Sequence, residues 1–343
     1  MRKNSKALIL AAAAGCGIAV IAKNIVENRS LDSLRGKTVL ITGGSRGLGL
    51  LLAREFARQG CRVAICARHA DQLDRAREDL KSRGAEAWSR TCDVTDREQV
   101  RGFIGDLTAQ FGSIDLLVNN AGIIQVGPAS SMTEEDYDFA LKTMFSGPLN
   151  MIFAVLPEMR KRQTGRIVNI TSIGGKVSVP HLLPYCCAKF ALVALSEGLR
   201  TELRREGIRV TTIVPGLMRT GSHVNALFKG RQEEESTWFG LSASLPLVSK
   251  NAECAARTIV RAVRRGDAER TVSLSAAFLA RLHGLFPGVT ASLLSLANEF
   301  ILPASEGGEM TAKAGKEIPS PVPPILEKLM RLGRTAAEGY NQL

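Results

Sequence analysis

Between Lys37 and Ser275 the chain alternates between short apolar runs rich in β-branched residues and longer stretches with helical spacing, such as Leu48, Leu51 and Leu52. Seven of the short runs predict strands: Lys37–Thr42, Arg62–Cys66, Glu86–Cys92, Asp115–Asn119, Arg166–Thr171, Arg209–Val214 and Arg270–Leu274. Strands that alternate with helices need right-handed crossovers. The pattern therefore predicts an α/β fold, a doubly wound, Rossmann-like parallel sheet of seven strands with helices on both faces.

The apolar stretch Val272–Pro303 has few charges and is divided by Pro287-Gly288, which predicts two short helices with apolar faces. We favour a cap over a substrate cleft for this pair, and a surface that enters lipid is the alternative. After Pro303 the composition predicts a loop through residues 306–309 and 319–324, then a charged helix from about Ile325.

The first predicted strand runs into a glycine-rich turn that precedes a helix: Thr42-Gly43-Gly44-Ser45-Arg46-Gly47-Leu48-Gly49. Glycine lets backbone approach a pyrophosphate without an intervening Cβ, and the helix N-terminus offers free N–H groups. At this place in the chain the motif predicts a dinucleotide site, and the alternative is a glycine-rich turn without a ligand. The predicted contacts are Gly43, Ser45, Arg46, Gly47, Leu48 and Gly49.

The end of the second predicted strand indicates which dinucleotide is bound. An acidic residue there would bind the ribose 2′-hydroxyl of NAD, but this chain has Arg68 in the neighbourhood and Arg46 in the turn. Two guanidinium groups suit a phosphate dianion. The sequence thus favours NADP(H) over NAD(H), and the alternative is that both arginines are simply solvated.

A candidate catalytic group follows the strand Arg166–Thr171. Ser172 comes directly after this strand, and Tyr185 and Lys189 are spaced to share one face of a helix. A serine hydroxyl can hold a carbonyl oxygen while a phenol donates a proton to it. A nearby ammonium group favours phenolate, so we expect Lys189 to lower the pKa of Tyr185 towards working pH.

Several motifs occur in register over Arg35–Ser275: Thr42-Gly43-x-x-x-Gly47-x-Gly49, Asp93-Val94, Asn119-Asn120-Ala121-Gly122, Ser172, Tyr185-x-x-x-Lys189, Pro215-Gly216 and Thr220. In these motifs the chain resembles the short-chain dehydrogenase/reductase family, in its compact, non-extended subgroup. The resemblance implies that Tyr185 is the acid/base, that Lys189 holds the nicotinamide ribose, and that Ser172 orients the substrate carbonyl. It also implies contacts around the cofactor: Asp93 and Val94 at the adenine, Asn119, Ala121 and Gly122 beside the dinucleotide, and Pro215, Gly216 and Thr220 at the nicotinamide end. Taken alone, Asp93 fits a helix N-cap or turn residue equally well.

One position departs from the family pattern. Where the family usually has an asparagine that holds a water in the proton path, we align Met144. A thioether is a weak acceptor and cannot donate a hydrogen bond. Either Ser146 or the backbone holds that water, or proton supply is slower, so a member without activity is an alternative.

The composition is that of a globular protein, with 45% hydrophobic and 23% charged residues. The net charge of +12 raises the question of nucleic acid, but the basic residues are dispersed and aromatic residues make up only 5%. We therefore expect no nucleic-acid partner, and attraction to anionic lipid headgroups fits the charge better. The seven cysteines form no CxxC pair, so we expect no metal site, and a reducing compartment fits.

Near the beginning, the uncharged stretch Ala7–Ala22 lies between the basic residues Arg2, Lys3, Lys6 and Lys23. It is shorter than the roughly 20 residues that span a bilayer comfortably. A short uncleaved anchor, a cleaved secretory signal and a packed soluble helix all fit. We favour the anchor, on the cytoplasmic side of a membrane, because NADPH is made there; the alternative is a soluble cytoplasmic protein. The expected organisation is an anchor or targeting segment (1–34), a dinucleotide-binding domain (35–278) and an extension (279–343).

Together these features predict an NADP(H)-dependent oxidoreductase that interconverts a carbonyl and an alcohol. Leu227-Phe228 and Trp238-Phe239, after Thr220, suggest a flexible lid and an apolar substrate that is lipid-like, steroid-like or acyl. The resemblance implies a homo-oligomer formed through the helices that carry Met144 and Tyr185. The main alternative is a catalytically silent NADP-binding scaffold or redox sensor. Epimerase or dehydratase chemistry on a nucleotide-linked sugar fits less well, because such relatives have a differently spaced glycine motif.

Overall fold

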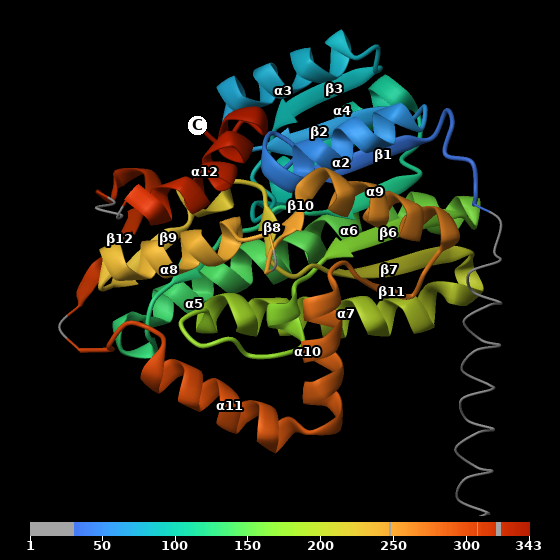
Figure 1. Cartoon of the computed structure of the whole chain (residues 1–343). Coiled ribbons are helices and arrows are strands. Elements are labelled where there is room, and N and C mark those ends of the chain that lie inside the picture. Colours follow the sequence, from blue (N-terminus) through green and yellow to red (C-terminus); the bar gives the residue numbers. More distant parts are fainter. Residues whose placement is uncertain (1–30, 247, 307, 320–323) are drawn as a thin grey trace, which may run out of the picture. The chain divides into compact units, whose positions relative to one another are not determined.

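The computed structural model describes residues 31–246, 248–306, 308–319 and 324–343. By its internal contacts the chain divides into two units, Met1–Ser33 and Leu34–Leu343, and all described helices and strands belong to the second (Figure 1). The apolar stretch Ala7–Ala22, predicted as an anchor, lies outside the described residues.

The second unit is built on a parallel sheet of seven strands in the order β3-β2-β1-β4-β6-β7-β11. The strands are β1 (Thr38–Thr42), β2 (Arg62–Ala67), β3 (Ala87–Thr91), β4 (Leu116–Asn119), β6 (Gly165–Ile170), β7 (Ile208–Val214) and β11 (Glu269–Thr271). The doubly wound fold and all seven predicted strands are confirmed. The largest difference in bounds is at β11, which ends at Thr271 rather than Leu274.

Successive residues of the central strands pack into two different cores. Val39 and Ile41 of β1 belong to one buried cluster, whereas Leu40 between them belongs to the other. Side chains alternate between the faces of a strand, so this division means that both faces of the sheet are covered. It explains why these strands are continuous apolar runs in the sequence.

Helices cover each face of the sheet (Figure 1). The first core contains side chains of α2 (Gly47–Arg58), α3 (Ala70–Ser82) and α9 (Ala252–Arg265). The second contains side chains of α4 (Arg97–Phe111) and α6 (Gly147–Arg162), with α7 (Leu183–Glu202) packed against it. β1 lies between β2 and β4, so the strand order reverses there, and the carboxyl ends of β1 and β4 form the crevice where such folds bind ligands.

One helical stretch of the described residues, Glu134–Arg162, is long and apolar enough to cross a membrane. It comprises α5 (Glu134–Leu141), the π-helical turn η2 (Lys142–Ser146) and α6. Half of its most apolar window is buried, and Met151, Ile152 and Val155 of α6 pack into the second core. We therefore assign it as a core helix.

A small second sheet lies beside the main one, with strands β5 (Gln125–Val126), β9 (Leu227–Gly230) and β12 (Glu309–Ala314). Val126, Phe228, Phe239 and Ile318 form its buried core together with α8 (Gln232–Ser244). Phe228 and Phe239, expected in a flexible lid, are thus packed residues. The loop predicted after Pro303 is interrupted by β12, because β12 gains its hydrogen bonds from β9, about 80 residues earlier.

Beyond β11 the two predicted apolar helices are confirmed as α10 (Leu274–Leu285) and α11 (Pro287–Phe300). They contact each other and extend away from the main sheet (Figure 1, orange). Their large apolar side chains are exposed: Leu274, Phe278, Leu285, Phe286, Val289, Leu293, Leu296 and Phe300. The last helix, α12 (Pro324–Gly339), begins one residue before the predicted start and contacts α8.

Candidate active site

The glycine-rich turn after β1 packs directly against the loop after β4. Gly43 and Gly47 have positive φ angles of +63° and +56°. A Cβ on Gly43 would lie 2.9 Å from the Ala121 Cα, and one on Gly49 would lie 2.1 Å from the Gly43 oxygen. Both contacts are with backbone, which cannot give way, so these positions require glycine.

Two residues of the predicted motifs, Thr42 and Asn120, join these loops, although no role was predicted for either by itself. The Asn120 Nδ2 donates to the Thr42 and Gly43 oxygens at 3.0 and 3.1 Å. The Thr42 Oγ1 in turn accepts from the N–H groups of Asn120 and Ala121, both at 3.0 Å. The crevice between β1 and β4 is therefore held in shape by hydrogen bonds that need no ligand.

The next residue back, Asn119, belongs to the sheet and is buried. Its Nδ2 donates to the Asn169 Oδ1 at 2.9 Å, and Asn169 continues to Ser196 and Thr212. This chain of buried hydrogen bonds crosses from β4 to β6, α7 and β7. Asn119 thus supports the sheet beneath Gly122, which is exposed at the crevice.

At the start of α2 the structure brings together the two arginines predicted to bind a phosphate. Burial lowers the pKa of Arg46, and repulsion from Arg68 lowers it further. An anion placed between two such cations would relieve the repulsion and supply hydrogen-bond acceptors. The pair therefore fits a 2′-phosphate. Ser45, beside Arg46, is only 3% exposed.

Asp93 and Val94 follow β3 at the same edge of the sheet. The Asp93 Oδ1 accepts from the Thr95 N–H at 2.9 Å and from its hydroxyl at 2.8 Å. Asp93 therefore makes the hydrogen bonds of a turn residue, and its predicted place at the adenine stays a prediction. Val94 is buried, and its carbonyl accepts from the Asn150 side chain of α6 at 3.0 Å.

The three predicted catalytic side chains lie together beyond the end of β6. The Ser172 hydroxyl accepts from the Gly174 N–H at 3.1 Å and is hydrogen-bonded to the Tyr185 phenol. On α7 the Lys189 Nζ lies 5.6 Å from the centre of the Tyr185 ring. The Lys189 Nζ also donates to the Ile170 oxygen at 2.9 Å. A phenol, a hydroxyl and an amino group thus share one end of the sheet.

The pKa values in this cluster follow burial. Burial raises the pKa of Tyr185 to about 12, although the hydrogen bond with Ser172 opposes the rise. Burial likewise lowers the pKa of Lys189 to about 8. We expected Lys189 to lower the pKa of Tyr185, but the loss of solvent is the larger effect. Tyr185 is consequently a neutral phenol at neutral pH, the form that can donate a proton.

Met144 lies in η2, the π-helical turn between α5 and α6, and is 0% exposed. It belongs to a small buried cluster with Ala140 and Ala188, against which Tyr185 packs. A Cβ placed on Gly122 would lie 3.5 Å from the Met144 Sδ and 3.8 Å from the Lys189 Nζ. The thioether therefore lies between Gly122 and the cluster of Ser172, Tyr185 and Lys189. Single π-helical turns inside α-helices occur frequently at functional sites.

The segment after β7 forms the opposite wall. The Pro215 carbonyl accepts from the Ile173 N–H at 2.7 Å and so ties this wall to the turn after Ser172. A Cβ on Gly216 would lie 2.5 Å from the Ser273 Oγ. Thr220, the last predicted residue of this wall, is buried.

A buried polar group near Tyr185 escaped the sequence analysis. Glu235 of α8 is 0% exposed, and its Oε1 lies 2.7 Å from the His181 Nδ1. The Trp238 Nε1 donates to its Oε2 at 2.6 Å. His181 precedes Tyr185 by four residues and has a φ of +61°, and its carbonyl accepts from the Gly127 N–H. The group fastens α8 to the start of α7, but no local motif in the sequence signals it.

Comparisons with known proteins agree with this geometry. A family model for short chain dehydrogenases matches residues 37–229. A "Dehydrogenase/reductase SDR family protein 7-like" from Anopheles gambiae is 39% identical over 207 residues, which cover 59% of this chain and 65% of that protein. The oxidoreductase UcpA of Salmonella typhimurium is 40% identical over 191 residues, which cover 55% and 72% of the two chains. The crystal structure of an actinorhodin polyketide ketoreductase with NADPH superposes with a TM-score of 0.61 at 28% identity, covering 69% of this chain and 95% of that one.

Proposed function

Since this chain belongs to the short-chain dehydrogenase family, we propose that it is an NADP(H)-dependent oxidoreductase that interconverts a carbonyl and an alcohol, with Tyr185 as proton donor and acceptor. The observation that carries the proposal is the grouping of Ser172, Tyr185 and Lys189 at the carboxyl end of the sheet, beside the glycine-rich turn. An NADPH-bound polyketide ketoreductase among the similar structures supports the choice of reaction and cofactor.

The residues around the crevice fit NADP(H). Arg46 and Arg68 would hold its 2′-phosphate, and the N–H groups at the start of α2 would hold its pyrophosphate. The buried amino group of Lys189 would donate to the nicotinamide ribose, in line with the family resemblance. When bound, the cofactor supplies or accepts the hydride.

The chain's own residues would manage the proton and the orientation of the substrate. The Ser172 hydroxyl can turn from Tyr185 towards a substrate oxygen and hold it next to the phenol. Tyr185, neutral at working pH, donates its proton to that oxygen during reduction. In the reverse direction the phenolate accepts the proton of the alcohol. Holding the reacting groups in this arrangement provides much of the expected rate gain.

The alternative function is a catalytically silent NADP-binding scaffold or redox sensor. The observation that favours it is Met144, because its buried thioether lies beside Lys189 and Tyr185, where a water-binding group would connect Lys189 to solvent. Dinucleotide binding without turnover would support this alternative.

The exposed apolar side chains on α10 and α11 bear on substrate and location. Large apolar surfaces on soluble proteins commonly mark sites of contact with membranes or other proteins. We propose that this helix pair rests on the cytoplasmic surface of a membrane and that the substrate is apolar: lipid-like, steroid-like or acyl. The exposed Phe153 on α6 and Phe190 on α7 support association between copies through these helices.

The test is a fluorescence titration of the full chain with NADPH and NADH, followed by a panel of ketones and aldehydes of increasing chain length. We expect tighter binding of NADPH, loss of this preference in Arg46→Ala/Arg68→Ala, and turnover of long-chain carbonyls. Equal binding of both dinucleotides would refute the NADP(H) preference. Faster turnover of small hydrophilic ketones than of long-chain ones would refute the apolar substrate.

A further inference from the structure

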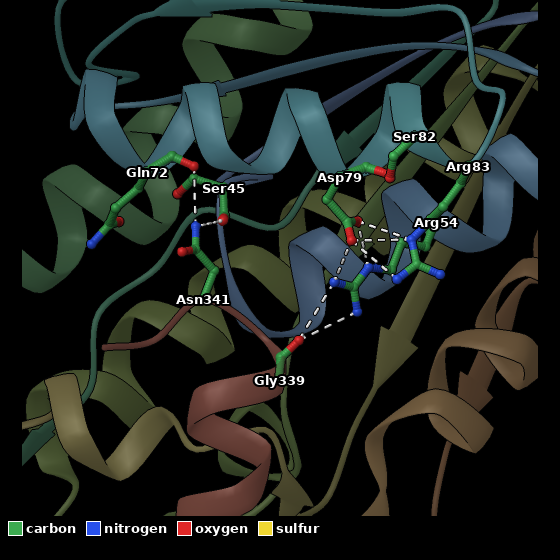
Figure 2. Close-up of polar contacts among 8 residues, drawn as sticks. All are labelled: Ser45, Arg54, Gln72, Asp79, Ser82, Arg83, Gly339 and Asn341. Carbon is green, nitrogen blue, oxygen red and sulfur yellow. Dashed lines mark hydrogen bonds and ion pairs between the residues drawn. The ribbon is translucent and has the colours of Figure 1, made fainter.

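The segment Gly339–Leu343, which begins at the last residue of α12, crosses the glycine-rich turn and the start of α3. The Tyr340 carbonyl accepts from the Gly47 N–H at 2.8 Å. The Asn341 Nδ2 donates to the Ser45 oxygen at 2.8 Å and to the Gln72 oxygen at 3.1 Å. Figure 2 shows the Asn341 amide between Ser45 and Gln72, with Gly339 facing Arg54. The segment therefore bridges the β1–α2 turn and α3.

The same segment also binds the opposite wall of the crevice. Gln342 is 5% exposed, and its Nε2 donates to the Thr220 oxygen at 3.3 Å. Asn225 donates to both the main-chain and the side-chain oxygen of Gln342, at 2.8 and 3.0 Å. The Gln342 Nε2 would lie only 2.5 Å from a Cβ on Gly47. Gln342 thus fills the space that the missing side chain of Gly47 leaves open and connects it to the wall after β7.

Two arginines on the neighbouring helices fix the segment in place. The Arg75 Nε donates to the Asn341 Oδ1 at 2.8 Å. Arg54 reaches the Gly339 oxygen at 3.4 Å while its guanidinium pairs with Asp79 (Figure 2). The last turn of α12 approaches Gly221 so closely that a Cβ there would lie 2.4 Å from the Ala337 Cα. These contacts define one seated position for the segment.

This position conflicts with dinucleotide entry. The Gly47 N–H belongs to the first turn of α2, whose N–H groups lack partners inside the helix and receive phosphate in dinucleotide-binding folds. In this structure the uncharged Tyr340 carbonyl accepts from that N–H. Asn341 and Gln342 lie across the crevice between its two walls. The segment's contacts with Ser45, Gly47 and Thr220 are hydrogen bonds between uncharged groups, which are weaker than hydrogen bonds to a charged phosphate. The seated segment can therefore be displaced.

We propose that Gly339–Leu343 is a latch that joins the two walls of the dinucleotide crevice and must release before NADP(H) enters. The inference rests on the proposed function, since it concerns access to the proposed cofactor site. It assigns Asn341 and Gln342 as residues that control cofactor exchange and that lie far from the site in the sequence.

The test is stopped-flow binding of NADPH, followed by its fluorescence, to the full chain and to two variants. One variant lacks residues 340–343, and the milder one is Asn341→Ala/Gln342→Ala. Only molecules with an open latch can bind NADPH, so the apparent association rate falls with the open fraction. We therefore expect NADPH to associate about tenfold faster with both variants than with the full chain. In the full chain the observed rate should reach a plateau at high NADPH, set by latch opening, and the plateau should vanish in the variants. The matched control is Glu338→Gln on the exposed face of α12, which should behave like the full chain.

Hydrogen exchange at the Gly47 amide provides a second readout that does not depend on turnover. The amide should be protected in the full chain and exchange faster in both variants, while the rest of β1 and α2 keeps its protection and so reports that the variants are folded. Unchanged association rates with normal NADPH binding would overturn the latch alone. Failure of the full chain and both folded variants to bind either dinucleotide would overturn the proposed function and the latch with it.

Discussion

At the scale of single residues, the amino group of Lys189 is buried, where the charged form is disfavoured. Burial lowers its pKa to about 8, and the Ile170 oxygen accepts its hydrogen bond. Burial raises the pKa of Tyr185 beside it to about 12, so in both groups burial disfavours the charged form. Such paired shifts outside the usual range are typical of functional sites.

Lys189→Met should change how stability depends on pH. Below pH 8 the buried ammonium is charged in the folded protein and costs stability. Between pH 8 and 10.5 the folded form has lost this proton and the unfolded form still holds it, so the cost disappears as pH rises. Urea unfolding should show wild type gaining about 3 kcal/mol relative to Lys189→Met over this range. Other groups titrate equally in both proteins, so they cancel in the comparison. A difference in the free energy of unfolding that stays constant between pH 8 and 10.5 would contradict the pKa assigned to Lys189.

Tyr185→Phe should lower kcat by about 10²- to 10⁴-fold while NADPH binding stays within twofold, since only the proton donor is removed. Steady-state turnover and fluorescence titration measure the two quantities. Tyr137→Phe on α5 is the matched control, with the same atom removed outside the cluster, and should retain full turnover. Equal turnover in Tyr185→Phe and wild type would exclude Tyr185 as the acid.

At the scale of elements, the strands and the helix α7 were predictable from the sequence, and the contacts made by the extension were not. β1 and β4 are buried on both faces, so each is an apolar run that local sequence reveals. The grouping of Ser172, Tyr185 and Lys189 could be predicted because strand ends and helix spacing are local features too, and their catalytic roles stay a prediction. β12 was missed because its partner β9 lies far away in sequence, and Glu235 because its contact with His181 depends on how α8 packs against the segment before α7.

The π-helical turn η2 gives Met144 its position, and Met144→Asn tests its effect. An asparagine there can hold a water near Lys189, so we expect kcat to rise severalfold if proton supply limits turnover. Burying an amide in an apolar cluster should lower the free energy of unfolding by about 2 kcal/mol. Steady-state assays measure kcat, and urea unfolding measures the free energy of unfolding. Ala140→Ser, a polar change in the same cluster, is the control and should leave kcat unchanged, whereas an unchanged kcat in Met144→Asn would show that proton supply is not limiting.

At the scale of the whole molecule, the pair α10–α11 adds an apolar surface to an otherwise ordinary α/β unit. Its exposed Phe278 and Phe300 should insert into the headgroup region of a membrane. Phe278→Ser/Phe300→Ser should reduce co-sedimentation with anionic phospholipid vesicles at least threefold and leave NADPH binding intact. Val248→Ser, another exposed apolar position, is the control. Undiminished sedimentation of the double variant would refute the assignment of this surface to lipid.

The contact between Asn341 and Ser45 also has a consequence for biosynthesis. The two residues are 296 positions apart, so the glycine-rich turn emerges from the ribosome long before the segment that will cover it. During that interval the Tyr340 carbonyl is not yet present to accept from the Gly47 N–H. Because the Tyr340 carbonyl and a bound phosphate would compete for the Gly47 N–H, a dinucleotide captured co-translationally under the proposed function would keep the covering segment from seating until the dinucleotide leaves.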